Sequence, residues 1–238
     1  MGEHPAAMPH GAIDEVFEDV FMVTGTMRNE FFGSMWQFSR NMVVVRDDGA
    51  LTLINAVRLD DEGLAALDAL GAVKHVVRIG SMHGHDDPFY VEHYGATYWA
   101  LPSMPPKETP PVDRELRVGG ELPFPGASLF SFEATKLPEG ILRLDRDGGI
   151  LIACDSLQNW LGPDEFFDES TVEKMSEMGF FAPANLGPAW VHANDPKPDD
   201  FVRLKEIEFR HVLCAHGSPL RNTAMPDFHS TFARVFDI

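Results

Sequence analysis

Three strand-like segments of this sequence end in side chains that can bind a metal ion. His83, His85 and Asp87 follow one apolar segment, Asp155 follows a second, and His216 follows a third. Zinc, iron and manganese accept histidine and carboxylate ligands, and a His-x-His pair on an extended segment points both rings to one side. Because functional side chains often converge from loops at strand ends, these five residues predict one metal site.

The segments that position these side chains alternate between strand and helix patterns. Strands are predicted at residues 16–24, 42–46, 51–56, 74–80, 128–132, 140–144, 150–154 and 211–216. Helices are predicted to begin at Asp60 or Asp61, at Asp87-Pro88, at the capping box Ser170–Glu173, and at Asp199 or Asp200. The turn signal Asp47-Asp48-Gly49 predicts a hairpin, and residues 180–198 are predicted to be loop. This order predicts a single α/β domain over residues 1–238, with residues 1–12 flexible.

Composition and charge exclude several classes of function. The chain has 238 residues, 44% of them hydrophobic, with a formal net charge of −18. So acidic a surface repels phosphate backbones, which argues against nucleic-acid and anionic-membrane binding. No secretory signal pattern and no apolar run of about 18 residues occurs, so we expect a cytoplasmic protein. Cys154 and Cys214 are too few for a disulfide framework and fit small core residues.

The order of the motifs resembles that of the metallo-β-lactamase-fold hydrolases. The resemblance spans roughly Ile13 to Leu220, and each segment alone is a weak signal. The matching segments are Asn41–Val45 with Leu53–Ala56, His83–Pro88 for H-x-H-x-D-H, Ala153–Asp155 for the strand ending in G-D, and Ala215–Gly217 for the G-H-G-like turn. The resemblance implies a four-layer αββα sandwich of two mixed sheets.

This sequence departs from the family pattern at three positions. Pro88 stands where the family has the last histidine of H-x-H-x-D-H, and Asn55 replaces the usual aspartate of D-T-G. Lys136 aligns with the histidine of the G-H-T-P-G segment. The resemblance therefore implies that each half of the family's two-metal centre has lost one ligand.

The ligands that remain from the family pattern imply a single divalent metal ion, zinc or iron. The resemblance implies that His83, His85 and Asp155 hold it, joined by His216, with Asp87 as a further ligand or as the general base. Asp155 ends an apolar strand, where an unpaired carboxylate would be costly. Lys136 is a candidate catalytic residue together with Asp87, and it also has a second interpretation, because its ammonium group beside Asp87 and Asp155 would replace the charge of a lost metal.

These ligands lead to three hypotheses about function. The first is a metal-dependent hydrolase of a small ester, lactone, thioester or amide, in which metal-bound hydroxide is the nucleophile. The second is a non-catalytic protein of the same fold, in which Lys136 fills the metal site and apolar loops bind a ligand or partner. The third is a mononuclear iron dioxygenase, because that branch also uses two histidines and one aspartate. A small-molecule substrate is the expected partner.

Two apolar segments offer walls for a substrate pocket. Residues 31–36 (FFGSMW) follow the first strand, where related folds carry a flap over the substrate. The second patch comprises Phe166, Phe167, Met175, Met178, Phe180 and Phe181. Core packing or a homodimer interface explains the second patch equally well.

Overall fold

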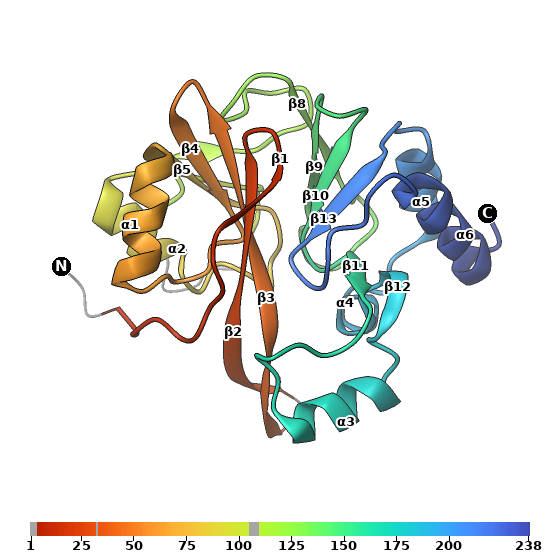
Figure 1. Ribbon diagram of the computed structural model, residues 1–238. Coiled ribbons are helices and arrows are strands. Elements are labelled where there is room, and N and C mark those ends of the chain that lie inside the picture. Colours follow the sequence, from red (N-terminus) through yellow and green to blue (C-terminus); the bar gives the residue numbers. More distant parts are fainter. Residues whose placement is uncertain (1–3, 32, 105–109) are drawn as a thin grey trace.

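The computed structural model describes residues 4–31, 33–104 and 110–238, and their strands form two mixed sheets packed face to face (Figure 1). The seven-stranded sheet has the order β1 (Asp14–Phe17), β2 (Val20–Phe31), β3 (Ser34–Asp47), β4 (Ala50–Ile54), β5 (Ala72–Arg78), β6 (Thr97–Ala100) and β7 (Arg114–Glu115). The four-stranded sheet has the order β13 (His211–Cys214), β10 (Ile150–Ala153), β9 (Gly140–Leu144) and β8 (Ala127–Ser131). A two-stranded sheet joins β11 (Leu157–Trp160) to β12 (Ala182–Leu186).

Helices cover the outer faces of both sheets, which completes the expected four-layer αββα sandwich (Figure 1). The first sheet is covered by α1 (Asp61–Leu70) and α2 (Asp87–Tyr94). The second is covered by α4 (Pro188–Asn194), α5 (Pro198–Lys205) and α6 (Ala224–Phe236). The remaining helix, α3 (Glu169–Glu177), lies at one end of the sandwich (Figure 1).

The central core lies between the two sheets, and β3 shows why its sequence is almost continuously apolar. Val43 and Val45 belong to the core between the sheets, whereas Met42 and Val44 belong to the core under α1 and α2. Alternate side chains of a strand point to opposite faces, so a strand buried on both faces needs apolar residues at every position.

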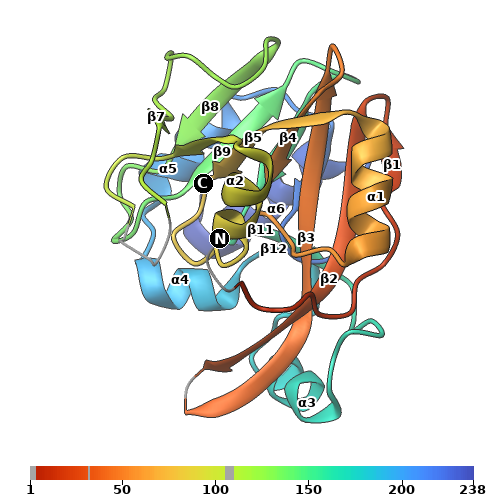
Figure 2. The same cartoon turned by 90° about the vertical axis from the view of Figure 1, so that its left-hand side faces the viewer.

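The β2–β3 hairpin extends beyond the sandwich (Figure 2), and its aromatic residues Trp36 and Phe38 belong to one hydrophobic cluster with Met175 of α3. Its strands pair continuously from Val20 opposite Val45 to Phe31 opposite Ser34. The backbone N–H of Gln37 donates to the Thr171 hydroxyl of α3 over 2.9 Å. The expected flap, residues 31–36, is therefore the outer end of this hairpin, except that Phe32 lies outside the described residues.

Two local sequence signals are confirmed by the backbone. Asp48 and Gly49 both have positive φ angles, 46° and 74°, which is the geometry of the tight turn that joins β3 to β4. Asp60 caps α1, where its side chain accepts a 2.9 Å hydrogen bond from the backbone N–H of Gly63. Residues 9–11 hydrogen-bond to β2, although residues 1–3 lie outside the described range.

Two predicted elements are wrong, and each has a physical reason. Residues 16–24 form two strands, because Asp19 adopts a φ of 59° and turns the chain between β1 and β2. Residues 180–198 contain β12 and α4 instead of only loop. The strand β12 pairs with β11, where Leu157 lies opposite Leu186. A pattern in the local sequence cannot predict this strand, because its partner is distant in the sequence.

The cap of α3 is Asp168 rather than the predicted Ser170, which leads to a stability prediction. Asp168 accepts from the backbone N–H of Thr171 over 2.7 Å, whereas the Ser170 hydroxyl donates to Asp168. Asp168→Ala should therefore lower the free energy of unfolding by about 1 kcal/mol. Ser170→Ala should cost less than half as much, and urea denaturation measures both. A larger loss for Ser170→Ala would restore the predicted capping box.

Among the described residues, no helix is both long and apolar enough to span a membrane. Cys154 and Cys214 are free and buried, as expected from their place in apolar strands.

Candidate metal site

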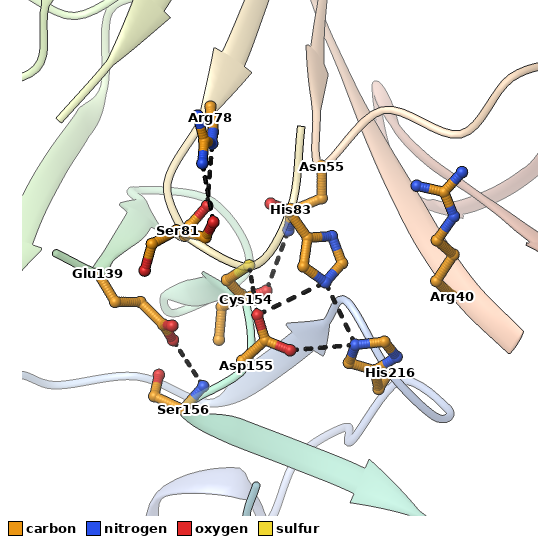
Figure 3. A network of polar contacts seen from close by, with 12 residues as sticks. Arg40, Asn55, Arg78, Ser81, His83, Glu139, Cys154, Asp155, Ser156 and His216 are labelled. Atoms are coloured by element: carbon orange, nitrogen blue, oxygen red, sulfur yellow. Dashed lines mark hydrogen bonds and ion pairs between the residues drawn. The ribbon is translucent and has the colours of Figure 1, made fainter. Parts of the chain in front are cut away.

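The ends of three strands bring His83, Asp155 and His216 together between the two sheets (Figure 3). His83 follows β5 of the seven-stranded sheet, whereas Asp155 and His216 follow β10 and β13 of the four-stranded sheet. Because β10 and β13 are parallel neighbours, with Ala153 opposite Cys214, both chains leave the sheet at the same edge. Side chains that are 61 and 133 residues apart in sequence thus become neighbours.

The three side chains converge through single atoms. The Nε2 atoms of His83 and His216 are 3.2 Å apart, and His216 Nε2 lies 3.2 Å from Asp155 Oδ1. His83 Nε2 is 3.6 Å from Asp155 Oδ2, and the three residues are only 5–7% exposed. His216 Nδ1 donates to the Ser39 carbonyl over 3.1 Å, so its Nε2 can face the cluster with a lone pair.

These separations fit the ligand shell of one small cation. Zinc binds histidine nitrogen at 2.0–2.1 Å in tetrahedral geometry, so adjacent ligand atoms stand about 3.3 Å apart. A fourth donor is close, because Cys154 Sγ lies 3.4 Å from Asp155 Oδ2. His83, Cys154 and Asp155 together form a buried group that could hold a metal ion, with ligand atoms within 4.8 Å of one another.

Burial and charge favour the metal-binding forms of His83 and Asp155, but they favour the protonated thiol of Cys154. Burial lowers the pKa of His83, against the effect of nearby Asp155, and favours the neutral imidazole. Burial opposes ionisation of Asp155, but His83 and His216 outweigh it and hold its pKa well below the usual range. Burial, with the charge of Asp155, raises the pKa of the Cys154 thiol. Neutral histidine and ionised aspartate are the ligating species.

Comparison with known proteins finds similarity in structure but not in sequence. No protein-family model and no curated protein matches the sequence. Solved structures do match, and the DIM-1 metallo-β-lactamase superposes with a TM-score of 0.63 at 14% identity, covering 98% of this chain and 99% of that one. FIM-1 from Pseudomonas aeruginosa, in its mono-zinc form, gives 0.60 at 13% identity with 97% of both chains covered. The chain has the metallo-β-lactamase fold.

A third metallo-β-lactamase, from Erythrobacter litoralis, gives a TM-score of 0.57 at 14% identity and covers 94% of this chain and 92% of that one. Sequence identities of 13–14% support a shared fold but do not support a shared function. The chemistry of this protein has to be inferred from its own side chains.

The structure does not place His85 beside His83, although the metallo-β-lactamase pattern pairs them. Gly84 has a φ of 100°, so the backbone turns between the two histidines and the same-side rule for an extended segment does not apply. His83 is buried at the cluster, whereas His85 is exposed in a neighbouring cleft with Arg40 and Asp86.

Asp87 and Lys136, the two expected catalytic residues, have other surroundings. Asp87 is fully buried at the start of α2, where its Oδ2 accepts a 3.0 Å hydrogen bond from the Tyr98 hydroxyl. Lys136 is exposed and lowers the pKa of Asp195, behind the stronger effect of Lys197. The structure therefore does not bring Lys136 to Asp155, and the idea that its ammonium group replaces a metal loses its geometric basis.

Sequence reasoning missed Glu139, which is the residue of the Lys136 loop that reaches the cluster (Figure 3). Its side chain is 1% exposed, and its Oε1 accepts a 2.5 Å hydrogen bond from the backbone N–H of Ser156. Burial and the charge of Asp155 raise the pKa of Glu139 well above its usual range. The sequence did offer one signal for Glu139. It lies three residues after Lys136 and directly before Gly140, the first residue of β9, and is therefore at the start of a strand like the other candidate residues at strand ends.

Gly217 shows how tightly the His216 turn is built. Its φ is +88°, and a Cβ there would lie 2.2 Å from the carbonyl oxygen of Asn159, so only glycine fits. Asn41 fixes the same turn, because its Nδ2 donates to the Gly217 carbonyl over 2.7 Å. The turn that follows His216 is therefore held by the Asn159 backbone and by the Asn41 side chain.

An apolar pocket of about 80 Å³ opens onto the cluster. The side that forms the candidate metal site carries His83, Asp155 and His216. Its other walls are mostly apolar and come from the β2–β3 hairpin, from α3 and from neighbouring loops; they are Met27, Phe31, Trp36, Phe38, Met82, Gln158, Trp160, Met175, Phe180 and Ala189. Both expected apolar segments thus contribute to one pocket, the hairpin end through Phe31 and Trp36 and the second patch through Met175 and Phe180.

Proposed function

We propose that this protein is a metal-dependent hydrolase of a small ester, lactone, thioester or amide. The observation that carries the proposal is the convergence of two histidine Nε2 atoms and the Asp155 carboxylate on one side of an apolar pocket. A zinc ion bound by such residues acts as a Lewis acid and brings the pKa of water to roughly 7.

Each residue of the cluster has a distinct part in this proposal. His83, Asp155 and His216 hold the metal, with Cys154 as the nearest further donor. Trp160 orients His216, since its ring stacks on the imidazole with centroids 5.0 Å apart and planes 23° apart. The apolar walls exclude water and hold the acyl group of the substrate. FIM-1 supports the proposed stoichiometry of one metal, because a protein of this fold has been solved in a mono-zinc form.

The size of the pocket points to a small acyl group. A cavity of about 150 Å³ can bind benzene, whereas this one measures about 80 Å³. The formal charge of −18 also supports a small-molecule partner over nucleic acid or an anionic membrane.

A second candidate is a mononuclear iron dioxygenase. Two histidines and one carboxylate are the ligand set of non-haem iron oxygenases, and His83, His216 and Asp155 supply it. The identity of the bound metal separates the two candidates.

Metal content and turnover test both candidates. We expect untagged protein to retain about one equivalent of metal by plasma mass spectrometry, as a single site with three protein ligands would. Asp155→Asn keeps the shape of the side chain but removes its charge, so it should lose the metal, whereas the exposed control Asp195→Asn should keep it.

The outcomes differ clearly. Zinc with hydrolysis of p-nitrophenyl acetate supports the hydrolase, and iron with oxygen consumption supports the dioxygenase. Protein that holds no more metal than Asp155→Asn, even after reconstitution with either ion, contradicts both candidates.

A further inference from the structure

A second cleft adjoins the apolar pocket and carries positive charge. Its volume is about 190 Å³, and Met27 lines both this cleft and the pocket. Its charged or titratable lining side chains are Arg28, Arg40, Arg58, His85 and Asp86. Three arginines thus face a single carboxylate, and we call these residues with Met27 the arginine cleft.

This concentration of positive charge is unusual for so acidic a protein. The larger groove of about 810 Å³ has the opposite character, because Asp14, Glu15, Asp164 and Glu165 line it with Arg221 as their counter-charge. The arginine cleft is therefore a positively charged region on an otherwise acidic surface. Such a region attracts anions, whereas the rest of the surface repels them.

Two of the three guanidinium groups are held in place before any ligand arrives. Arg40 is 6% exposed, forms an ion pair with Asp86 and donates to the Ala56 carbonyl over 3.4 Å. The guanidinium of Arg58 lies 3.3 Å from the centre of the Phe89 ring, and its backbone N–H donates to Asp86 over 2.7 Å. Ordering these side chains in advance reduces the entropic cost of binding.

The same two arginines retain unused hydrogen-bonding capacity. The Nε atoms of Arg40 and Arg58 are buried and have no hydrogen-bond partner within the described part of the chain. Buried donors without acceptors are unfavourable, and an oxyanion supplies several acceptors at once. Guanidinium groups match carboxylate and phosphate oxygens through paired N–H···O bonds.

The arginine cleft lies directly beside the metal-binding residues. Figure 3 shows Arg40 next to His83, and its positive charge contributes to the lowered pKa of that histidine, after the larger effect of burial. Met27 lines both the cleft and the apolar pocket, so the two spaces share a wall residue. A ligand with an apolar part and an anionic part can therefore occupy both spaces across the metal site.

We propose that the arginine cleft binds a carboxylate or phosphate group of the substrate. The proposal of an anion site depends only on the arginines of the cleft. The role of that site in catalysis rests on the proposed hydrolase function. The substrate is then an anionic ester, thioester or amide with a small acyl group in the apolar pocket.

Anion binding can be measured without catalysis. Inorganic phosphate and acetate are titrated calorimetrically into EDTA-treated protein, so that no metal competes for them. We expect binding to the wild type that weakens at least tenfold in Arg58→Gln and in Arg28→Gln, but not in Arg117→Gln, an exposed arginine outside the cleft. Because Arg28 is exposed, its variant stays informative if Arg58→Gln fails to fold.

The titrations also separate the two anion sources. Tighter binding of phosphate identifies a phosphorylated substrate, and tighter binding of acetate a carboxylate. Absence of binding to the wild type, or equal binding by all four proteins, overturns the proposal.

A matched pair of esters tests the role in catalysis. Mono-p-nitrophenyl glutarate and p-nitrophenyl valerate have acyl chains of equal length, but only the glutarate carries a carboxylate. We expect at least a tenfold higher kcat/KM for the glutarate ester in the metal-loaded wild type, and no preference in Arg58→Gln. If neither ester is cleaved, the hydrolase proposal fails. The titrations still show whether the arginine cleft binds an anion. Equal cleavage of both esters by the wild type contradicts the catalytic role of the cleft.

Discussion

Replacing His83 with alanine should abolish metal binding, whereas replacing His85 should leave the metal content unchanged. His83 Nε2 lies 3.2–3.6 Å from the other two ligand groups, but His85 is exposed on the far side of the turn at Gly84. Because loss of an outer-shell partner alone costs roughly 10–100-fold in metal affinity, loss of His83 itself should cost more than about 100-fold.

Competition with a chromophoric chelator measures the affinity of both variants, and circular dichroism verifies that they fold. His85→Ala is the matched control, since it removes the same ring two residues away. Equal loss of metal in the two variants would restore the His-x-His interpretation of the sequence. It would also mean that the segment around Gly84 rearranges when metal binds.

Replacing Trp160 with alanine should cost about 3–5 kcal/mol of unfolding free energy, as truncation of a fully buried tryptophan usually does. The side chain is 2% exposed and forms the centre of an aromatic cluster. Its ring stacks on His216 and contacts the rings of Phe38, Phe167, Phe180 and Phe181. The loss should therefore reduce metal affinity as well as stability.

Guanidinium denaturation followed by circular dichroism gives the stability of the variant. Trp160→Phe is the control, because it keeps a ring against His216 and should recover more than half of the loss. A cost below about 1 kcal/mol for Trp160→Ala would show that the cavity collapses, and that Trp160 does not support the site.

The family resemblance predicted the layers of the fold, and the sequence pattern predicted three residues that the structure brings together. Apolar runs that end in a ligand-type residue identified His83, Asp155 and His216, since a strand buried on both faces has an unmistakable pattern. The strands β11 and β12 were harder to find, because they are short and stabilised by each other. Their pairing joins residues that are 22 to 29 positions apart, from Trp160 opposite Ala182 to Leu157 opposite Leu186.

The errors at the site arose from backbone geometry. The same-side rule for His83 and His85 assumes an extended chain, and the positive φ of Gly84 removes that assumption. Alignment of Lys136 with a family histidine depended on a short loop, in which the chain instead directs Glu139 inward. Cys154 looked like a core residue, and it is one, but it also adjoins Asp155.

His83, Asp155 and His216, the candidate ligands, follow β5, β10 and β13, and this origin determines when the proposed site can form during synthesis. His83 and Asp155 emerge from the ribosome well before His216, and His216 reaches them only after β13 has paired with β10. A nascent chain that ends before residue 216 thus lacks one of the three candidate ligands, however well its first sheet has folded. On the proposed function, metal capture would therefore belong to a late stage of folding, and a retained ion would mark a finished molecule.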